Sequence, residues 1–388
     1  MPLPTATQSD GLLNLMQSIS RAAGGPRRYA ELARWPAERL REARHIVLLL
    51  VDGFGQAMLD TMPPDASLRR HVQGTLHSVF PSTTAAAVGT CLTGLAPAAH
   101  GLTGWHVRHG TPPRTLAILP LTARESGRSP TPEELDTLLP ELFPYPTLFE
   151  QLDRRSVVLS PRSIAGSPFN RWHTRGAEPL AHDGIADLCR QTADCLRAAQ
   201  TPHYVYAYYP EIDSLAHRHG WRSPQVAHAL GQFDVAFTGL VEALRGLDVW
   251  LIVTADHGFI DCPAERQIAI SDHPELAGLL DGPLSGEQRV AYAHVQPGRQ
   301  NEFATYIKEN LAHAIELHAS HALIAAGTFG PPPYHPSLHA RIGDFTLVMR
   351  EDWTIKDWLP GERPYRLIGQ HGGASIEETT VPLIAVRL

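Results

Sequence analysis

The sequence predicts an α/β fold: a mostly parallel sheet covered by helices on both faces, with a smaller α+β insertion. Four short apolar or aromatic runs carry this prediction, at residues 45–51, 157–159, 204–209 and 249–254. Such bounded runs are typical of strands that are buried on both faces of a parallel sheet. Helix-like stretches precede the second and fourth runs, and this alternation indicates βαβ units.

Two regions break the alternation. Residues 107–145 are rich in proline, threonine and arginine, which indicates an irregular excursion over the surface. Residues 262–365 have a pattern of their own, with two strand-like runs and one helix-like run. We therefore expect a core made of residues 1–261 and 366–388 that carries the chemistry. Residues 262–365 would form an inserted α+β cap, and such insertions often set substrate choice.

The composition and net charge limit which partners and substrates the protein can have. The chain has 388 residues, 43% hydrophobic and 19% charged, a balance typical of globular proteins with a large core. The formal net charge of -7 argues against nucleic-acid polymers and anionic membranes as partners. A small phosphate ester as substrate is compatible with this negative net charge, because bound cations reverse the charge at the site itself.

The sequence also bears on location. The first residues lack a signal-peptide pattern, and no run approaches the roughly 18 apolar residues that span a membrane. The four cysteines do not suggest a disulfide framework in a chain of this length. We therefore expect a cytoplasmic protein.

Acidic residues and histidines follow three of the apolar runs. Asp52 follows the first run, Asp213 and His217 follow the third, and Asp256 and His257 follow the last. Ligands of open α/β sheets bind beyond the carboxyl ends of the strands, where these side chains would meet. Asp213 and His217 would share one face of a helix and could chelate one ion. Taken alone, each position is more often a turn or a solvated helix face than a metal ligand.

A sixth candidate ligand, His371, lies in the segment GQHGG, whose glycines let the backbone approach closely and aim the ring. Aspartate and histidine supply the oxygen and nitrogen donors that Zn²⁺ prefers, although Mn²⁺ or Mg²⁺ also binds carboxylates. Six ligands divided three and three would hold two ions with open coordination positions.

A hydroxyl-rich segment, residues 78–94, indicates a loop that opens a helix of small residues. A hydroxyl in the first turn would lie among free N–H groups at the positive end of the helix dipole, where phosphate binds readily. Ser82, Thr83 and Thr84 are also good helix N-caps, so a purely structural role is the alternative.

Taken together, these residues resemble the alkaline phosphatase superfamily and, within it, the type I phosphodiesterase/nucleotide pyrophosphatase family. The resemblance runs from Asp52 to Pro382. It rests on the segments VDGFG, FPSTTAAAVGTCLTGLAPAAHGL, EIDSLAH, TADHG and QHGG followed by VPL. It implies a three-layer α/β/α sandwich of the alkaline phosphatase type and a two-metal hydrolase of phosphate esters.

The resemblance also implies roles for single residues. One zinc would be held by Asp213, His217 and His371, and the other by Asp52, Asp256 and His257. Thr84, ten residues before the glycine of the LTG motif, takes the position of the family's nucleophilic threonine. A covalent phosphothreonine at Thr84 would then be hydrolysed by water. Thr83 is the second choice for the nucleophile.

Two departures from the family pattern concern substrate binding. An aromatic residue usually follows the nucleophile and stacks on the base, whereas Ala85 follows Thr84 here; Tyr208 occupies the position of the other aromatic residue. The family's phosphate-binding asparagine, shortly after the HGL segment, is also missing. The candidate substrate contacts are therefore Tyr208, Trp105, His106, Arg108, Asn170 and Arg171.

The sequence leaves some alternatives to a phosphodiesterase open and excludes others. A phosphomonoesterase needs extra positive charge, which Arg108, Arg162 or Arg171 could supply, and a phosphonate hydrolase is also compatible. A sulfatase is excluded because the segment CLTGL lacks the required proline and arginine. A catalytically silent ligand-binding relative is disfavoured because all six ligands and the hydroxyl are present. The Glu377–Glu378 pair beyond His371 is expected to be a solvated turn.

Overall fold

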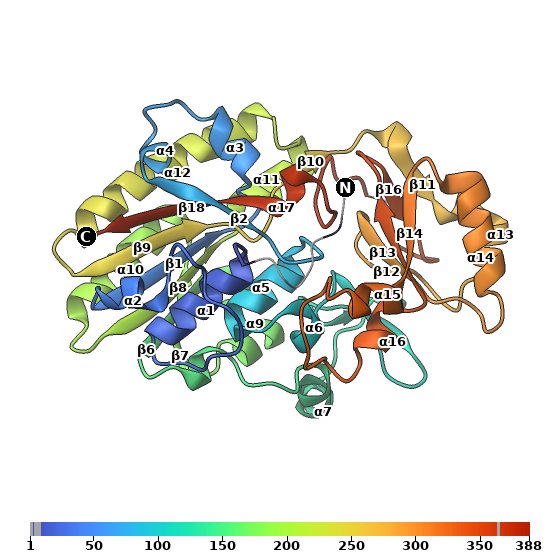
Figure 1. Ribbon diagram of the computed structural model, residues 1–388, viewed down its shortest axis with the longest axis horizontal. Coiled ribbons are helices and arrows are strands. Elements are labelled where there is room, and N and C mark those ends of the chain that lie inside the picture. The colour runs from blue at the N-terminus through green and yellow to red at the C-terminus, as the bar shows by residue number, and fades with distance from the viewer. Residues whose placement is uncertain (1–2, 4–8, 363–364) are drawn as a thin grey trace.

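The computed structural model describes residue 3, residues 9–362 and residues 365–388. Its main sheet has seven strands in the order β2-β18-β9-β1-β8-β6-β7 (Figure 1). Their bounds are β1 His45–Val51, β2 Val72–His77, β6 Arg155–Pro161, β7 Ala177–His182, β8 His203–Tyr209, β9 Val249–Thr254 and β18 Thr380–Arg387. The strands β9, β1, β8, β6 and β7 pair in parallel, whereas β18 is antiparallel to both β9 and β2. The predicted mostly parallel sheet is confirmed.

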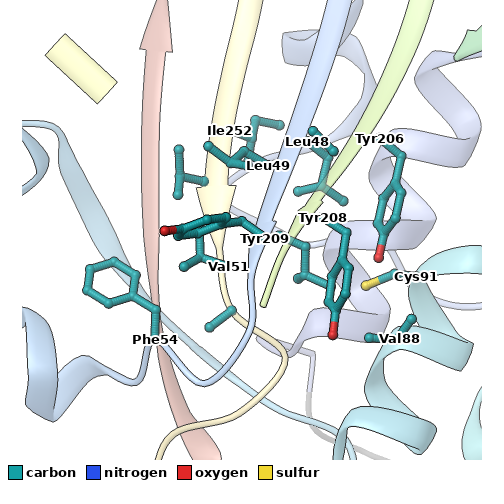
Figure 2. Packing of buried hydrophobic residues seen from close by; sticks show 14 of the residues in the cluster. Leu48, Leu49, Val51, Phe54, Val88, Cys91, Tyr206, Tyr208, Tyr209 and Ile252 are labelled. Carbon is teal, nitrogen blue, oxygen red and sulfur yellow. The ribbon is translucent and has the colours of Figure 1, made fainter. Parts of the chain in front are cut away.

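The centre of this sheet is buried on both faces. Strands β1, β8 and β9 are buried at every position, which explains why their sequences are continuous apolar runs rather than alternating patterns. Successive side chains of β8 point to opposite faces (Figure 2). Tyr206 and Tyr208 lie beside Val88 and Cys91 of α5, whereas Tyr209 stacks on Phe233 of α12 with ring centroids 6.3 Å apart.

Helices therefore cover both faces, as the sequence predicted. Helices α1 (Leu12–Ala22), α2 (Ala37–Arg41) and α5 (Thr84–Thr93) pack together on one face. Helices α4 (Ser67–Arg70), α10 (Ile185–Ala198), α11 (Glu211–His219) and α12 (Pro224–Leu244) form the group on the other face. The shorter helices of the core are α3 Gln56–Thr61, α6 Pro97–His100, α8 Arg162–Ala165, α9 Pro168–His173 and α17 Ile376–Thr379.

A second seven-stranded sheet lies beside the core in the order β14-β15-β13-β12-β3-β4-β5 (Figure 1). Its strands are β3 His106–His109, β4 Arg114–Ala117, β5 Thr122–Ala123, β12 Ser285–Gly286, β13 Val290–Ala293, β14 Ile315–Ala319 and β15 Phe345–Met349. Helices α13 (Pro274–Ala277), α14 (Gln300–Tyr306), α15 (Ser320–Ala325) and α16 (Leu338–Ile342) accompany it. Its own apolar core includes Phe303, Ile315 and Leu347.

Three of these strands correct a prediction. The segment 107–145 was expected to be irregular, but β3, β4 and β5 extend the second sheet, and α7 (Pro132–Leu142) follows them with a capping box at Thr131. Strands of two to four residues are too short to show a period of two in the sequence. The boundaries 262 and 365 of the cap stay a prediction, since its sheet also contains strands from outside them.

Two small strand pairings lie near the site. Strand β10 (Ile260–Asp261) pairs with β17 (Gly369–Gln370), and β11 (Gln267–Ala269) pairs with β16 (Thr354–Lys356). Within the described residues, no helix combines the length and apolar character that crossing a membrane requires.

Candidate active site

The carboxyl ends of three adjacent strands carry the predicted ligands. Asp52 follows β1, Asp256 and His257 follow β9, and α11 begins just after β8. Because β8, β1 and β9 are parallel neighbours, these ends meet at one edge of the sheet. The structure brings the six candidates together as two groups of three, namely Asp213, His217 and His371, and Asp52, Asp256 and His257.

The first three residues, here called the open group, border solvent. Asp213 Oδ1 lies 3.3 Å from His217 Nε2, one helical turn along α11. His371 Nε2 lies 3.2 Å from His217 Nε2 and 3.8 Å from Asp213 Oδ1. The side chains of Asp213 and His217 are 15% and 20% exposed, so a ligand can reach this group.

The other three residues, here called the buried group, are closed to solvent. His257 Nε2 lies 3.2 Å from Asp52 Oδ1 and 3.4 Å from Asp256 Oδ2, and none of the three side chains is more than 2% exposed. The second oxygen of Asp256 accepts the backbone N–H groups of Gly53 and His257, each at 3.0 Å. The second oxygen of Asp52 accepts the hydroxyl of Tyr208. These bonds fix which carboxylate oxygen faces the histidine.

Backbone carbonyls orient all three imidazoles. The Nδ1 atoms of His217, His257 and His371 lie 2.9, 3.1 and 3.3 Å from the carbonyl oxygens of Gly369, Gly258 and Ser82. A carbonyl only accepts, so each Nδ1 carries the proton and each Nε2 presents a lone pair to its group. Second contacts of this kind orient the histidines of metal sites.

The donor atoms fit one divalent cation in each group. One oxygen each of Asp52, Asp213 and Asp256 is buried without a hydrogen-bond partner among the described residues, and these are the oxygens that face the Nε2 atoms. Burial raises the pKa of Asp213 and of Asp256, and it lowers the pKa of His217 to about 4. Buried charges of this kind are costly unless they are paired or bind metal. Oxygen and nitrogen donors in threes suit Zn²⁺.

The structure separates the two candidate nucleophiles. Thr83 is the N-cap of α5 and Thr84 is its first residue. Thr84 Oγ1 lies 3.1 Å from His257 Nε2, against the buried group. Thr83 Oγ1 instead donates to a carboxylate oxygen of Glu287. Thr84 is therefore the hydroxyl beside the candidate ligands.

A cavity of about 1000 Å³ opens over both groups. Of the predicted substrate contacts, Trp105, His106, Asn170 and Tyr208 line this cavity. Trp105 is 39% exposed, whereas Tyr208 is buried and its hydroxyl donates to Asp52.

The arginines that the sequence offered are not among the residues lining the cavity within the described part of the chain. Arg108 pairs with Asp281 at 2.8 Å, Arg162 pairs with Asp183 at 2.7 Å, and Arg171 is exposed. The extra positive charge that a monoesterase needs does not come from these three side chains.

The family model of type I phosphodiesterases and nucleotide pyrophosphatases matches residues 46–116 and 149–374. The chain belongs to this family. The match confirms the resemblance found in the sequence, and the family's name refers to enzymes that cleave phosphoric esters and anhydrides.

The chain is similar to several known proteins. Human ectonucleotide pyrophosphatase/phosphodiesterase family member 5 is 25% identical over 169 residues, which cover 42% of this chain and 32% of that protein. The curated relatives are matched over less than two thirds of their length. An inactive threonine-to-alanine variant of murine family member 5, in complex with AMP, has a TM-score of 0.63 at 19% identity, covering 88% of this chain and 87% of that one. Phosphonoacetate hydrolase from Sinorhizobium meliloti, in complex with phosphonoacetate, has a TM-score of 0.65 at 16% identity, covering 89% and 91%. These structures confirm the alkaline phosphatase-like fold.

Three residues that line the cavity of this family member were missed in the sequence. Glu287 accepts the Thr83 hydroxyl and, at 2.8 Å, the backbone N–H of Trp105. Arg124 and Lys356 also line the cavity. Nothing in the sequence distinguishes Glu287 or Arg124. Lys356 does stand out, because the chain has two lysines in all.

A buried ion pair holds the loop that carries His371. Glu378 Oε2 lies 2.9 Å from Arg289 Nη2, and both side chains are at most 1% exposed. Glu378 Oε1 also accepts the backbone N–H of Gly373 at 2.8 Å. The solvated turn expected at Glu377–Glu378 is therefore wrong for Glu378, because Arg289 of the second sheet reaches it.

Proposed function

We propose that this family member is a two-metal hydrolase of phosphate esters, of the phosphodiesterase/nucleotide pyrophosphatase type, and that Thr84 forms a covalent phosphothreonine. The position of the Thr84 hydroxyl, 3.1 Å from His257 Nε2 beside two groups of ligands, carries this proposal. Family membership supports it. So does the inactive murine relative, in which a threonine is replaced by alanine.

Asp213, His217 and His371 would hold one divalent cation, and Asp52, Asp256 and His257 the other. We propose Zn²⁺ for both, with Mn²⁺ or Mg²⁺ as alternatives. When bound, the two cations would stabilise negative charge on the attacking and leaving oxygens of an in-line displacement.

The side chains of this protein would then act in two steps. Thr84 Oγ1 attacks the phosphorus, the bond to the leaving oxygen breaks, and the hydroxyl proton passes to water while the leaving oxygen takes one up. In the second step a water oxygen attacks the phosphorus, the bond to Thr84 Oγ1 breaks, and Thr84 regains a proton. Backbone N–H groups at the N-terminus of α5 would stabilise the phosphoryl oxygens.

A comparison of the two threonines tests the proposal. Protein reloaded with Zn²⁺ is assayed on bis-p-nitrophenyl phosphate as the wild type, as Thr84→Ala and as the matched control Thr83→Ala. We expect Thr84→Ala to lower kcat by on the order of 1000-fold or more, because no other hydroxyl can replace a nucleophile. The kcat of Thr83→Ala should stay within about tenfold of the wild-type value. Wild-type protein quenched with acid should carry phosphate on Thr84.

Two results would overturn the assignment. Turnover that survives Thr84→Ala but not Thr83→Ala would move the nucleophile to Thr83. A folded, metal-loaded wild type that hydrolyses neither diester nor monoester substrates would favour a ligand-binding relative without catalysis.

Glu287 supports a diester over a monoester. Its carboxylate accepts the hydroxyl of Thr83, next to the nucleophile, and thereby adds negative charge beside the phosphoryl position. A monoester phosphate carries one more negative charge than a diester and is repelled more strongly. A phosphomonoesterase is the second candidate, and the fold of phosphonoacetate hydrolase keeps phosphonate cleavage as a third. The ratio of kcat/KM on bis-p-nitrophenyl phosphate and p-nitrophenyl phosphate decides between the first two.

The cavity and the cysteines support proposals for the substrate and for the location of the protein. We propose a small phosphate ester as the substrate, because the site lies inside a cavity rather than on an open basic face. Cysteines 91, 189, 195 and 262 are free, which agrees with a reducing cytoplasm. Trp105 and Asn170, which line the cavity, are proposed to contact the substrate.

A further inference from the structure

The second sheet and its neighbours bring a buried cation to the cavity. Lys356 ends β16, lines the cavity and is 6% exposed. No ion pair or hydrogen bond joins its ammonium group to any side chain of the described residues. An ammonium group has three donors, and in the cavity those of Lys356 are free to bind a ligand.

Three carboxylates act on the charge of Lys356, those of Asp357, Glu362 and, across the cavity lining, Glu287, and the first two are already engaged by other groups. Asp357 Oδ1 lies 2.8 Å from Arg124 Nη2, and Asp357 Oδ2 accepts the backbone N–H of Leu284 at 2.7 Å. Glu362 Oε1 lies 2.8 Å from Arg124 Nε, and Glu362 Oε2 accepts the backbone N–H of Leu359 at 2.9 Å. Neither carboxylate is available to neutralise Lys356.

Arg124 is engaged in turn. Besides its two carboxylate partners, its Nη1 donates to the carbonyl oxygen of Leu284 at 3.0 Å. Its guanidinium group therefore fixes the loop after β16 rather than facing a ligand. Of Arg124 and Lys356, the lysine and arginine side chains that line the cavity within the described residues, Lys356 is the one without an ion-pair partner.

Two aromatic rings position the Lys356 ammonium group. Its nitrogen lies 4.8 Å from the ring centroid of Trp358 and 5.3 Å from that of Tyr365. Ring faces attract a cation without using its N–H groups for a strong hydrogen bond. Burial and the neighbouring Arg124 lower the pKa of Lys356. An anion in the cavity would offset both effects.

We propose that Lys356 binds a second anionic group of the substrate, phosphoryl or carboxylate, in addition to the phosphoryl group attacked by Thr84. This proposal rests on the proposed function and specifies its substrate class, a phosphate or phosphonate compound that carries a further anion. Thr84 and Lys356 line the same cavity, which is large enough for both ends of such a molecule. A charge-assisted hydrogen bond to Lys356 would then discriminate against substrates with a single anion.

Paired probes test the proposal by competition for the active site. Ethylphosphonate is compared with phosphonoacetate, which adds a carboxylate, and AMP is compared with ADP, which adds a phosphoryl group. We expect Lys356→Gln to weaken the binding of the two-anion probe in at least one pair. Its inhibition constant should rise by about tenfold or more, because one charge-assisted contact is lost. The inhibition constants of the one-anion probes should change by less than about twofold. Lys356→Arg should restore part of the loss, and the pair that responds identifies the second anion as carboxylate or phosphoryl.

The chain offers a matched control. Its other lysine, Lys308, is exposed in the short helix Ile307–Leu311. Lys308→Gln should leave all four inhibition constants unchanged. Equal weakening of one-anion and two-anion probes by Lys356→Gln would overturn the proposal, because it would indicate a general change of the site.

A second measurement needs neither turnover nor a variant. Acetic anhydride is applied to the wild-type protein, and mass spectrometry follows the acetylation of Lys356 and Lys308 in the same sample. We expect phosphonoacetate or ADP to slow acetylation of Lys356 severalfold, with ethylphosphonate and AMP having less effect and Lys308 unaffected by any probe. Acetylation of Lys356 that no probe changes would overturn the proposal.

The two readouts separate the two proposals. Protection of Lys356 in a protein that hydrolyses no ester would leave the anion subsite in place and remove the catalytic function. Hydrolysis that depends on Thr84, without protection of Lys356 and without selectivity in Lys356→Gln, would keep the catalytic function and remove the subsite.

Discussion

The open group and the buried group differ in charge and in access. The open group has one carboxylate and two imidazoles and is up to 20% exposed, whereas the buried group has two carboxylates and one imidazole and is at most 2% exposed. A buried group with two carboxylates should hold a divalent cation more tightly, and it is the group that Thr84 contacts. The open group is the one that solvent can reach. The two groups thus lie on different sides of the site, the buried group against the Thr84 hydroxyl and the open group against solvent.

The two groups are also supported differently. The buried group lies directly at the ends of β1 and β9, which are the centre of the main sheet. The open group takes His371 from a loop whose position depends on the buried pair Arg289–Glu378. A change in the second sheet should therefore reach the open group first.

The largest expected difference comes from removing one carboxylate charge in each group. Asp256→Asn should lower metal-dependent turnover by on the order of 1000-fold, since a bound cation contributes several kcal/mol to such reactions. At saturating Zn²⁺, Asp213→Asn should lower turnover less than Asp256→Asn does, because water can enter the open group as a replacement ligand. Metal content by elemental analysis and kcat across a Zn²⁺ titration measure both. Recovery of Asp256→Asn by excess Zn²⁺ would contradict the contrast.

The next effect concerns the ion pair behind the open group. Arg289→Met should lower the free energy of unfolding by about 3–5 kcal/mol, because it leaves the Glu378 carboxylate buried without its partner. The matched control is Arg266→Met, since the half-buried Arg266, whose side chain is 39% exposed, pairs with Glu351 and Asp352 near the surface. This change should lower the free energy of unfolding by less than about 1 kcal/mol. Urea unfolding with metal present gives both values. Equal losses in the two variants would show that the Glu378 pair carries no special weight.

The smallest effect concerns the support of the buried group. Tyr208→Phe removes the hydroxyl that Asp52 accepts, and we expect about 10–100-fold weaker metal binding or turnover. Tyr206→Phe is the matched control, because the buried hydroxyl of Tyr206 has no hydrogen-bond partner in the described part of the chain. It should leave metal binding unchanged and stability equal or slightly higher. A Tyr206→Phe defect as large as that of Tyr208→Phe would indicate a packing effect rather than support of Asp52.

Most of the ligand arrangement was predictable because it depends on local patterns. An apolar run that ends in Asp52, or in Asp256 and His257, identifies a strand and its carboxyl end at once. The rule that parallel strands present their carboxyl ends at one edge then brings these residues together. The helical spacing of Asp213 and His217 needed no tertiary information either.

The cavity wall was not predictable for the opposite reason. Glu287 and Lys356 reach the site through pairings between distant segments, such as Gly286 with His106 and Lys356 with Ala269. The burial of Glu378 likewise depends on Arg289, which lies far from it in the sequence. Short strands of this kind carry no periodic pattern, and a charged side chain looks the same in sequence whether it ends in solvent or in a cavity.

The position of β18 has a consequence for synthesis on the ribosome. Strand β2 pairs with β18, which lies between it and β9 in the main sheet. Residues 72–77 must therefore wait for residues 380–387, roughly 300 residues later, or on the order of 15–60 s at usual translation rates. Strand β9 (Val249–Thr254) lacks its outer neighbour for the last part of that time, roughly 130 residues of synthesis, and an exposed strand edge can pair with other chains. The yield of folded protein in a cell should therefore depend on translation speed and on chaperones that cover this edge.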